Sequence, residues 1–566
     1  MVKKQYIKSI VPIAVVVLPS IFITSFEINK MPTVSIALLL ILLLLFNKIL
    51  SEKINFFQSH LKISFITFSS LQIIIMAVIA ITQGQYLHIE TIDWDIASYL
   101  VASQDIGKGF LPNETQWESK GPLLFYIYYF ILTFTGKSFV LFKIINDILL
   151  YSISLILFFI IYRESKNNIY KSFFGTLFFS LSMSQPWAIS EYSEVYSLFF
   201  ISLAYLVLLK GRNTKSIFFL IGTLLSLSTL INQGSVLFII PFLFYIFIKR
   251  TEISFAMFRN FSLGLVLPHV FFFLLYLIND LTTVYIATYI QIPLGYIQAR
   301  FASFYELKIF LKEFFEFNPL LYFSFIAIGF YYAKYFFIDL VKRREVLNLI
   351  NLFIGASLAF YFIGSHNYYH HLIFLIFFIS VTFSKFPLNR EVLVIFVFLT
   401  LSGISIFSSS FNKASENLSD ISQVQNNYPL YQLSKVIDAN FDSNYSIFAL
   451  DYLLIPFYLD KPNYSYIIHP SNHFEDFIIK ALHDLEIIDK DYVGEIILKK
   501  EPDVILCSQR MIIRGVPTKN TLYNCAVTDY KINYKQLETE IYKRSENLRF
   551  YVDPYKDLNT YVKLKD

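Results

Sequence analysis

The fold of this chain depends on the stretch PLLFYIYYFILTF, residues 122–134, and on whether that stretch crosses a membrane. It has 13 residues, whereas a helix needs roughly 20 apolar residues to span the hydrocarbon core of a bilayer. It also contains three tyrosines, and tyrosine favours the membrane–water interface. We therefore predict a juxtamembrane or re-entrant helix here and not a span.

The composition of the whole chain is that of an integral membrane protein. Of its 566 residues, 55% are hydrophobic and only 16% are charged, while soluble proteins carry roughly 25% charged residues. The net charge of +5 comes from 47 basic and 42 acidic residues, which is too small an excess for a nucleic-acid-binding protein. We therefore expect membrane lipids, and no nucleic acid, among its partners.

Apolar runs long enough to cross a bilayer recur in the part of the chain before residue 410. Their lengths and spacing predict about 13 spans. These are residues 9–26, 32–50, 63–83, 138–161, 172–188, 191–209, 216–232, 235–248, 261–279, 319–338, 347–363, 367–383 and 391–408.

The basic residues of the short loops indicate the topology. Five loops are rich in Lys and Arg, at residues 163–171, 210–215, 249–259, 342–344 and 385–390. With the amino terminus inside and residues 122–134 not crossing, all five are cytoplasmic, as the positive-inside rule expects. Two long segments, about 84–137 and 280–318, and the C-terminal tail then share the extracytoplasmic face.

The tail has the composition of a soluble domain. From residue 411 onward, 40 of 156 residues are charged. Short apolar runs at 445–450 and 504–506 predict buried strands, and residues 474–485 have helical spacing. Both cysteines, Cys507 and Cys525, lie in the tail, so one disulfide bond could form there.

We therefore predict a multi-span membrane domain over residues 1–409 and an extracytoplasmic mixed α/β domain over residues 410–566. The fold class is an all-α polytopic membrane bundle with a large first outer loop that bears juxtamembrane helices. The expected location is the plasma (inner) membrane, with the C-terminal domain outside the cytoplasm or in the periplasm.

The first outer loop holds a cluster of ionisable residues near the membrane surface. They are Asp93, Asp95, Asp105, Glu118 and Lys120. A single acidic loop residue is usually just solvated, but ionisable groups at a membrane boundary are often functional. The cluster, its aromatic neighbours and the apolar run that follows favour a functional role.

Two motifs of this loop, DIASY at 95–99 and KGPL at 120–123, resemble those of the GT-C superfamily of polyprenyl-phosphate-sugar-dependent glycosyltransferases. The resemblance is to the branch with protein O-mannosyltransferases and lipid A aminoarabinose transferases, which carry Asp-Glu-x-x-Tyr-like and Lys-Gly-Pro-like stretches in this loop. Ile96 stands where that branch has a second acid, and Asp93 could substitute for it. Weaker similarities to this branch lie at Ser190 to Glu194, at Asn232-Gln233 and at Tyr369-His370-His371.

The resemblance implies transfer of a sugar from a polyprenyl-phosphate donor to a glycolipid, polysaccharide or protein outside the cytoplasm. Such a transfer needs a base for the acceptor hydroxyl and a cation or hydrogen-bond donor for the departing phosphate. We assign Asp95 as the base, with Asp93 as a second catalytic carboxylate, and expect burial to raise the pKa of Asp95. Lys120 is the phosphate ligand, and direct displacement inverts the anomeric centre.

Four further residues are predicted to bind substrate: Glu118, Tyr99, Arg300 and His370. Glu118 could instead pair with Lys120, Arg300 could anchor the interface, and His370 could be an interfacial histidine in contact with water. We expect no required metal or cofactor, although the Asp93-x-Asp95 pair could bind a divalent cation.

Three charged or polar side chains of the predicted spans are assigned structural roles. Lys143 and Asp147, at i and i+4 of one helix, are predicted to pair with each other. His269, alone in an apolar span, is predicted to be a hydrogen-bonded core residue.

Two other functions fit a multi-span protein with this topology. A flippase or transporter of lipid-linked saccharides predicts charged residues within paired, Gly- or Pro-broken spans, whereas the acids here cluster in one outer loop. A polysaccharide polymerase or ligase would be expected to rely on outer-loop arginines, of which Arg300 is available.

Overall fold

The computed structural model describes most of the membrane domain and part of the tail. The described residues are 65–90, 94–209, 214–249, 253–299, 303–338, 348–363, 368–386, 390–441, 444–450, 452–488, 502–508 and 558–562. The first two predicted spans, 9–26 and 32–50, lie outside them, as do Asp93, Arg300 and Cys525.

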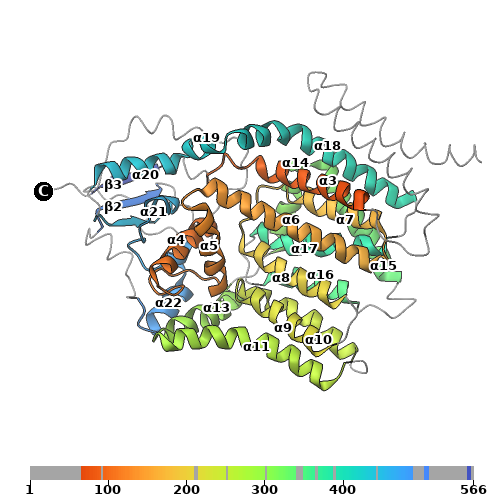
Figure 1. Ribbon diagram of the computed structural model, residues 1–566, viewed down its shortest axis with the longest axis horizontal. Coiled ribbons are helices and arrows are strands. Elements are labelled where there is room, and N and C mark those ends of the chain that lie inside the picture. The colour runs from red at the N-terminus through yellow and green to blue at the C-terminus, as the bar shows by residue number, and fades with distance from the viewer. Residues whose placement is uncertain are drawn as a thin grey trace, which may run out of the picture.

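The membrane domain is a bundle of helices that run in similar directions (Figure 1). Its helices are α3 (Phe65–Gly84), α6 (Phe139–Glu164), α7 (Ile169–Ser182), α8 (Ser193–Leu208), α9 (Lys215–Thr229), α10 (Ile239–Ile248), α11 (Phe255–Ile278), α15 (Pro319–Ile338), α16 (Leu349–Phe362), α17 (Ile373–Val381) and α18 (Arg390–Ser419). Short helical turns extend two of them, η3 (Gln233–Phe238) before α10, and η6 (Tyr369–Leu372) and η7 (Thr382–Lys385) around α17. A helix thus lies at each predicted span within the described residues.

Four of the described helical segments are long and apolar enough to cross a membrane, namely Thr67–Gly84, Phe139–Glu164, Phe255–Ile278 and Ile395–Ser419. Others are apolar but shorter than 18 residues. The predicted span 172–188 is too long, because α7 ends at Ser182 and turns follow. Pro186 explains the difference, since proline donates no backbone hydrogen bond and disfavours helical geometry at the residue before it.

Polar caps and small residues set how these helices begin and pack. Side chains of Ser138, Asn168 and Thr214 accept a backbone hydrogen bond at the start of α6, α7 and α9. Helices α9 and α11 approach closely through two glycines. A Cβ atom at Gly222 would lie 2.1 Å from the Phe261 carbonyl oxygen, and one at Gly264 would lie 2.2 Å from that of Phe219.

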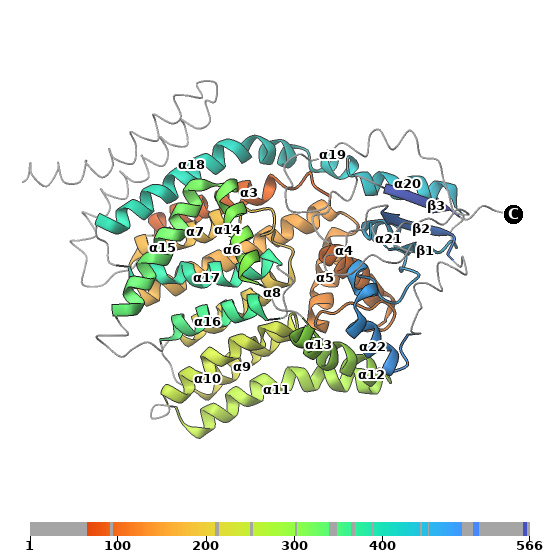
Figure 2. The same cartoon turned by 180° about the vertical axis from the view of Figure 1, so that it is seen from behind.

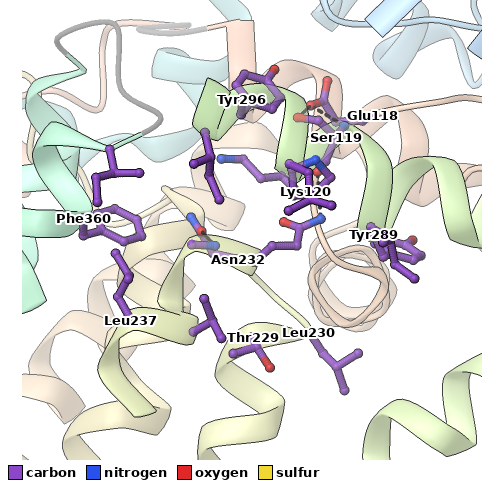
Figure 3. A pocket seen from close by; sticks show the side chains of 18 of the residues that line it. Glu118, Ser119, Lys120, Thr229, Leu230, Asn232, Leu237, Tyr289, Tyr296 and Phe360 are labelled. Atoms are coloured by element: carbon purple, nitrogen blue, oxygen red, sulfur yellow. Dashed lines mark hydrogen bonds between the residues drawn. The ribbon is translucent and has the colours of Figure 1, made fainter. Parts of the chain in front are cut away.

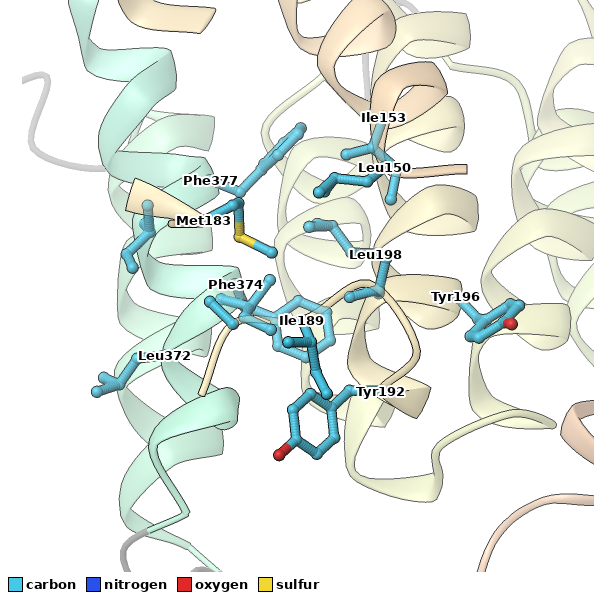
Figure 4. Packing of buried hydrophobic residues seen from close by; sticks show 14 of the residues in the cluster. Leu150, Ile153, Met183, Ile189, Tyr192, Tyr196, Leu198, Leu372, Phe374 and Phe377 are labelled. Atoms are coloured by element: carbon cyan, nitrogen blue, oxygen red, sulfur yellow. The ribbon is translucent and has the colours of Figure 1, made fainter. Parts of the chain in front are cut away.

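The core of the bundle is built of large apolar side chains from distant parts of the sequence. Figure 4 shows Leu150 of α6, Leu198 of α8 and Phe374 of α17 packed together with residues of the 183–192 turn. All three side chains have no solvent exposure. This packing fixes the positions of the helix ends that carry polar residues.

Lys143 and Asp147 form no direct ion pair among the described contacts, although their charges interact as predicted. Lys143 donates instead to the backbone carbonyls of Tyr86 and Ile89. Asp147 accepts from the Ser190 hydroxyl at 2.7 Å. Both side chains therefore join neighbouring turns to α6 and do not form an ion pair among the described contacts.

The first outer loop folds into α4 (Trp94–Gln104), η2 (Asp105–Lys108) and α5 (Pro122–Thr135). Residues 122–134 are thus a short helix, as predicted, and their placement in a bilayer stays a prediction. Leu124 and Tyr128 are fully buried, whereas Phe130 and Phe134 are 62% and 69% exposed. The helix therefore presents an apolar face outward, which is suitable for contact with lipid.

The second long segment is also helical, although the sequence left it unassigned. It forms α12 (Thr282–Ile286), a π-helical turn η4 (Ala287–Gln291), α13 (Ile292–Ala299) and α14 (Phe304–Phe317). Helix α13 contacts a helix of the tail, α22 (Asp476–Asp484).

The tail combines helices with a small sheet, next to α4 and α5 in both views (Figures 1 and 2). Its elements are α19 (Ile421–Asn426), α20 (Pro429–Asn440), β1 (Ile447–Ala449), α21 (Leu454–Leu459), η8 (Pro470–Phe474), α22 (Asp476–Asp484), β2 (Val504–Ser508) and β3 (Leu558–Val562). Strand β2 lies in the middle, parallel to β1 and antiparallel to β3, with Ile447 opposite Val504.

The predicted strands and the predicted helix of the tail are confirmed. Helix α18 runs without a break through residue 410, so the predicted domain boundary falls inside it. The division at 409/410 and the outer location of the tail stay predictions.

Candidate active site

A cavity of about 720 Å³ lies where the first outer loop, the turn after α9, η6, α13 and the tail meet. One part of its lining is polar and comprises Asp95, Glu118, Ser119, Lys120, Asn232, Gln233, His370, His371, His469, Ser471 and Asn472. Another part is apolar and includes Leu230, Val236, Leu237, Ile239, Leu265, Ile290, Leu294 and Ile297. Figure 3 shows this separation, with Glu118 and Lys120 on one side and Leu230 and Leu237 on the other.

The Lys-Gly-Pro turn is held against the end of α9. The Gly121 and Leu123 N–H groups donate to the carbonyl oxygens of Ile231 and Leu230, each at 3.1 Å. A Cβ atom at Gly121 would lie 2.0 Å from the Leu230 oxygen, so only glycine allows this approach. Pro122 then begins α5, where its missing N–H has no cost. The turn thereby holds Lys120 at the cavity.

Lys120 faces a fully buried carboxylate. Its Nζ lies 3.9 Å from Glu194 Oε1, in the first turn of α8, where the helix dipole favours an anion. Asn232 donates to the same Glu194 oxygen at 2.8 Å. Burial lowers the pKa of Lys120, but the charges of Glu194, Asp95 and Glu118 outweigh it and raise that pKa overall. Lys120 is therefore a fixed ammonium group.

Two histidines complete this cluster. His371 Nε2 lies 3.5 Å and His370 Nε2 lies 3.9 Å from Glu194. The three residues offer ligand atoms within 4.8 Å of one another, a spacing open to a divalent ion. However, the Lys120 ammonium already supplies positive charge to Glu194, which disfavours a second cation there.

Asp95 begins α4 and contacts the tail. Its carboxylate lies 2.8 Å from His469 Nε2, and its side chain is 21% exposed. We predicted a raised pKa, and this is wrong. Burial does act in that direction, but the hydrogen bond from His469 and the charge of Lys120 hold the pKa of Asp95 below its usual value. Asp95 is therefore an ionised acceptor at neutral pH.

Glu118 is buried and only half satisfied. Its Oε1 accepts from the Ser119 N–H at 2.7 Å and from the Ser119 hydroxyl at 2.9 Å. Its Oε2 accepts no hydrogen bond from the described residues. Burial and the nearby Asp95 raise the pKa of Glu118, despite His469 and Ser119. Lys120 forms its ion pair with Glu194 and not with Glu118, which was the alternative role predicted for Glu118.

The structure brings four of the predicted site residues together at the cavity: Asp95, Glu118, Lys120 and His370. Tyr99 does not line it; this side chain is fully buried and packs edge-on against Phe125 and Tyr128. Asp93 and Arg300 lie outside the described residues, and so does half of the Asp93-x-Asp95 pair. His269 is hydrogen-bonded to Thr229 at 2.9 Å, as predicted, but it is half-buried and borders the cavity, so it is not a core residue.

Two residues of this site were missed or undervalued by sequence reasoning. Glu194 is only part of a weak similarity to the family in the sequence. Its position at the end of a predicted span, next to Ser193, could have indicated that it belongs to the site. His469 was missed because about 370 residues separate it from Asp95. The only signal was the polar run His469 to His473 directly after the apolar residues 466–468.

Comparisons with known proteins concern the fold. ArnT from Cupriavidus metallidurans, solved bound to undecaprenyl phosphate, matches with a TM-score of 0.49 and 12% identity, over 78% of this chain and 93% of that one. The likeness between this chain and ArnT is one of fold.

A second solved structure matches less well. It is the archaeal oligosaccharyltransferase AglB from Archaeoglobus fulgidus, in complex with an inhibitory peptide and a dolichol-phosphate. Its TM-score is 0.42 at 10% identity, over 77% of this chain and 69% of that one. No protein-family profile matches the chain, and no curated protein sequence matches it. Because both TM-scores are below 0.5, the case for a function rests on the residues of the cavity.

Proposed function

We propose that the protein is an integral-membrane, inverting glycosyltransferase that moves a sugar from a polyprenyl-phosphate donor to an extracytoplasmic acceptor. The observation that carries the proposal is one cavity in which an ionised carboxylate, a fixed ammonium group and an open apolar wall meet. A glycolipid, a polysaccharide and a protein all carry the nucleophilic hydroxyl that such an acceptor must supply.

The apolar wall suits the prenyl chain of the donor. Val236, Ile290, Leu294 and Ile297 line the cavity and remain 46% to 54% exposed. Burying apolar surface contributes roughly 25 cal/mol per Å². A prenyl chain that lies on this wall would therefore bind through the apolar surface that it buries. The polar part of the lining would then receive the phosphate and the sugar.

The polar side chains suit the transfer step. The acceptor oxygen attacks the anomeric carbon while its proton passes to the Asp95 carboxylate. The bond between that carbon and the phosphate oxygen breaks, and its electron pair leaves with the polyprenyl phosphate. Lys120 stabilises the departing phosphate as a point charge, and His370 borders the same space. No metal takes part in this scheme.

A flippase or transporter of lipid-linked saccharides is the second candidate. It would need charged groups along a path through the membrane. In the described residues, the carboxylates and the lysine of the cavity come from the outer loop, and its histidines come from η6, the tail and, for His269, α11. This clustering favours chemistry at one face. A polymerase or ligase shares the cavity and would differ in its acceptor.

The test is transfer by the purified protein in liposomes that contain polyprenyl-phosphate sugars. We expect Asp95→Asn to lower kcat at least about 100-fold, since it removes the proton acceptor. Asp460→Asn is the matched control, because Asp460 is a carboxylate that is 60% exposed and paired with Lys137 away from the cavity lining. Full activity of Asp95→Asn would overturn the assignment of the base.

A further inference from the structure

The carboxylate of Asp95 is held by a residue of the tail. His469 Nε2 lies 2.8 Å from Asp95 Oδ1, and the imidazole also meets the Trp94 ring edge-on at 6.1 Å between centroids. Both His469 and Asp95 line the cavity, together with Ser471. A histidine of the tail thus contacts the residue assigned as the base.

The other nitrogen of His469 fixes which nitrogen carries the proton. The backbone N–H of Ser471 donates to Nδ1 at 3.2 Å, and the Ser471 hydroxyl lies 2.9 Å from the same atom. A backbone N–H can only donate, so Nδ1 is an acceptor and the proton of the neutral ring sits on Nε2. His469 therefore donates to Asp95.

The tail segment that carries His469 is joined to the first outer loop by backbone pairing. Trp117 N–H donates to the Tyr466 carbonyl at 2.6 Å, and Ile468 N–H donates to the Trp117 carbonyl at 3.1 Å. The Gln116 side chain exchanges two hydrogen bonds with the Asn463 backbone, at 2.7 and 3.0 Å. Because His469 follows Ile468 directly, this pairing sets its position against Asp95.

We propose that His469 is a positioning residue for the transfer reaction, so that the tail completes the active site of the membrane domain. This rests on the proposed function. The Nε2–H group holds the Asp95 carboxylate in one orientation through its contact with Oδ1. Ser471 holds the imidazole ring in turn.

Other charges also face Asp95 and must be considered in any pH measurement. Lys120 comes from the outer loop, and His370 and His371 come from η6. Glu118, Tyr99 and Tyr128 also interact with Asp95 electrostatically, and His473 interacts with His469. All of them remain in the variants below, so that only the contribution of His469 changes.

The experiment compares three substitutions at position 469 in the full-length protein in liposomes. Gln can place an amide N–H near the position of Nε2, whereas Asn reaches only the position of Nδ1. We expect His469→Ala and His469→Asn to lower kcat about tenfold or more, with KM for the lipid donor within about twofold. His469→Gln should recover most of kcat, and His483→Ala, an exposed histidine of α22, should match the wild type.

Two further readouts separate positioning from a general structural role. The acid limb of the kcat profile should move to higher pH in His469→Ala, because the hydrogen bond that lowers the pKa of Asp95 is lost. The loss of melting temperature caused by His469→Ala should be smaller in an Asp95→Ala background than in the wild type, because the two residues are coupled.

The outcomes are distinguishable. If the wild type is active and the Ala, Asn and Gln variants at position 469 all have the same kcat as one another, the inference is overturned. The glycosyltransferase proposal then remains intact. A wild type that is inactive with every donor overturns the proposed function and, with it, the positioning role. The melting-temperature cycle then still decides whether His469 and Asp95 are in contact.

Discussion

At the scale of single residues, the site depends on buried charges that neutralise one another. Glu194 has no solvent exposure, and its neighbours are Lys120, Asn232, His370 and His371. A buried carboxylate without a cationic partner is costly. We therefore propose two roles for Lys120, one in substrate binding and one in the stability of the fold.

Replacing Lys120 by Met should show both roles. We expect the free energy of unfolding to fall by about 3 kcal/mol, because Glu194 loses its cationic partner. Lys137→Met is the control, since Lys137 and Asp460 are 37% and 60% exposed and such a pair contributes at most about 1 kcal/mol. Thermal unfolding measures both, and Glu194→Gln should restore stability in the Lys120→Met background. Equal losses for the two lysine variants would contradict this account.

Glu118 is the residue at which substrate selectivity can be tested. Its Oε2 lies buried without a partner among the described residues, and a donor group of the sugar, such as a hydroxyl, would satisfy it. We expect Glu118→Gln to raise KM for the donor about tenfold, with a smaller change in kcat. Steady-state kinetics over a range of donors measures this, and an unchanged KM for every donor would exclude Glu118 from sugar binding.

At the scale of elements, the packing of α9 on α11 positions the loop that holds Lys120. The end of α9 supplies the Leu230 and Ile231 carbonyl groups that bind the Lys-Gly-Pro turn. Gly222 and Gly264 let the two helices approach, since an added Cβ at either position would meet a backbone oxygen at 2.1 or 2.2 Å. Helix packing and site geometry are therefore linked.

Substituting Gly222 by Ala should separate the two helices. We expect a loss of about 1–3 kcal/mol in the free energy of unfolding, as for other overpacked sites, and a lower kcat because the turn at residue 230 shifts. Gly329→Ala is the matched control, because a Cβ at Gly329 of α15 has no neighbour within 4 Å and alanine favours a helix by roughly 1 kcal/mol over glycine. Destabilisation by both substitutions would contradict the close-approach argument.

The elements themselves could largely be predicted from the sequence. Long apolar runs predict helices because a buried or lipid-facing backbone must satisfy its own hydrogen bonds, and α15 matches its predicted range, 319–338. Errors arose where a local residue ended a helix, as Pro186 does after α7. Helices α12 to α14 were not predicted, because their apolar residues are interrupted too often to resemble spans.

At the scale of the whole molecule, the candidate active site joins parts of the chain that no local pattern relates. Asp95 and Lys120 were predicted because the loop motifs are local. His469 and Glu194 come to the same cavity through tertiary packing, and neither spacing nor composition indicates such contacts. The raised pKa expected for Asp95 failed for the same reason, because it neglected His469.

The orientation in the membrane can be tested with two matched Ser→Cys substitutions at exposed sites, in a background with Cys507 and Cys525 replaced by Ser. Ser422 lies in the tail, which is predicted to be outside, and Ser216 begins α9 next to a loop predicted to be cytoplasmic. A membrane-impermeant thiol reagent should label Ser422→Cys and not Ser216→Cys in intact cells. The reverse pattern would invert the topology.

The central claim is that the cavity transfers a sugar and does not translocate a lipid-linked one. The most direct measurement follows wild-type protein in sealed liposomes with a doubly labelled polyprenyl-phosphate sugar and an acceptor extract on the outer side. Our account predicts free polyprenyl phosphate together with the sugar label on the acceptor, with its anomeric configuration inverted. Movement of the intact donor across the bilayer, with no cleavage, would contradict it.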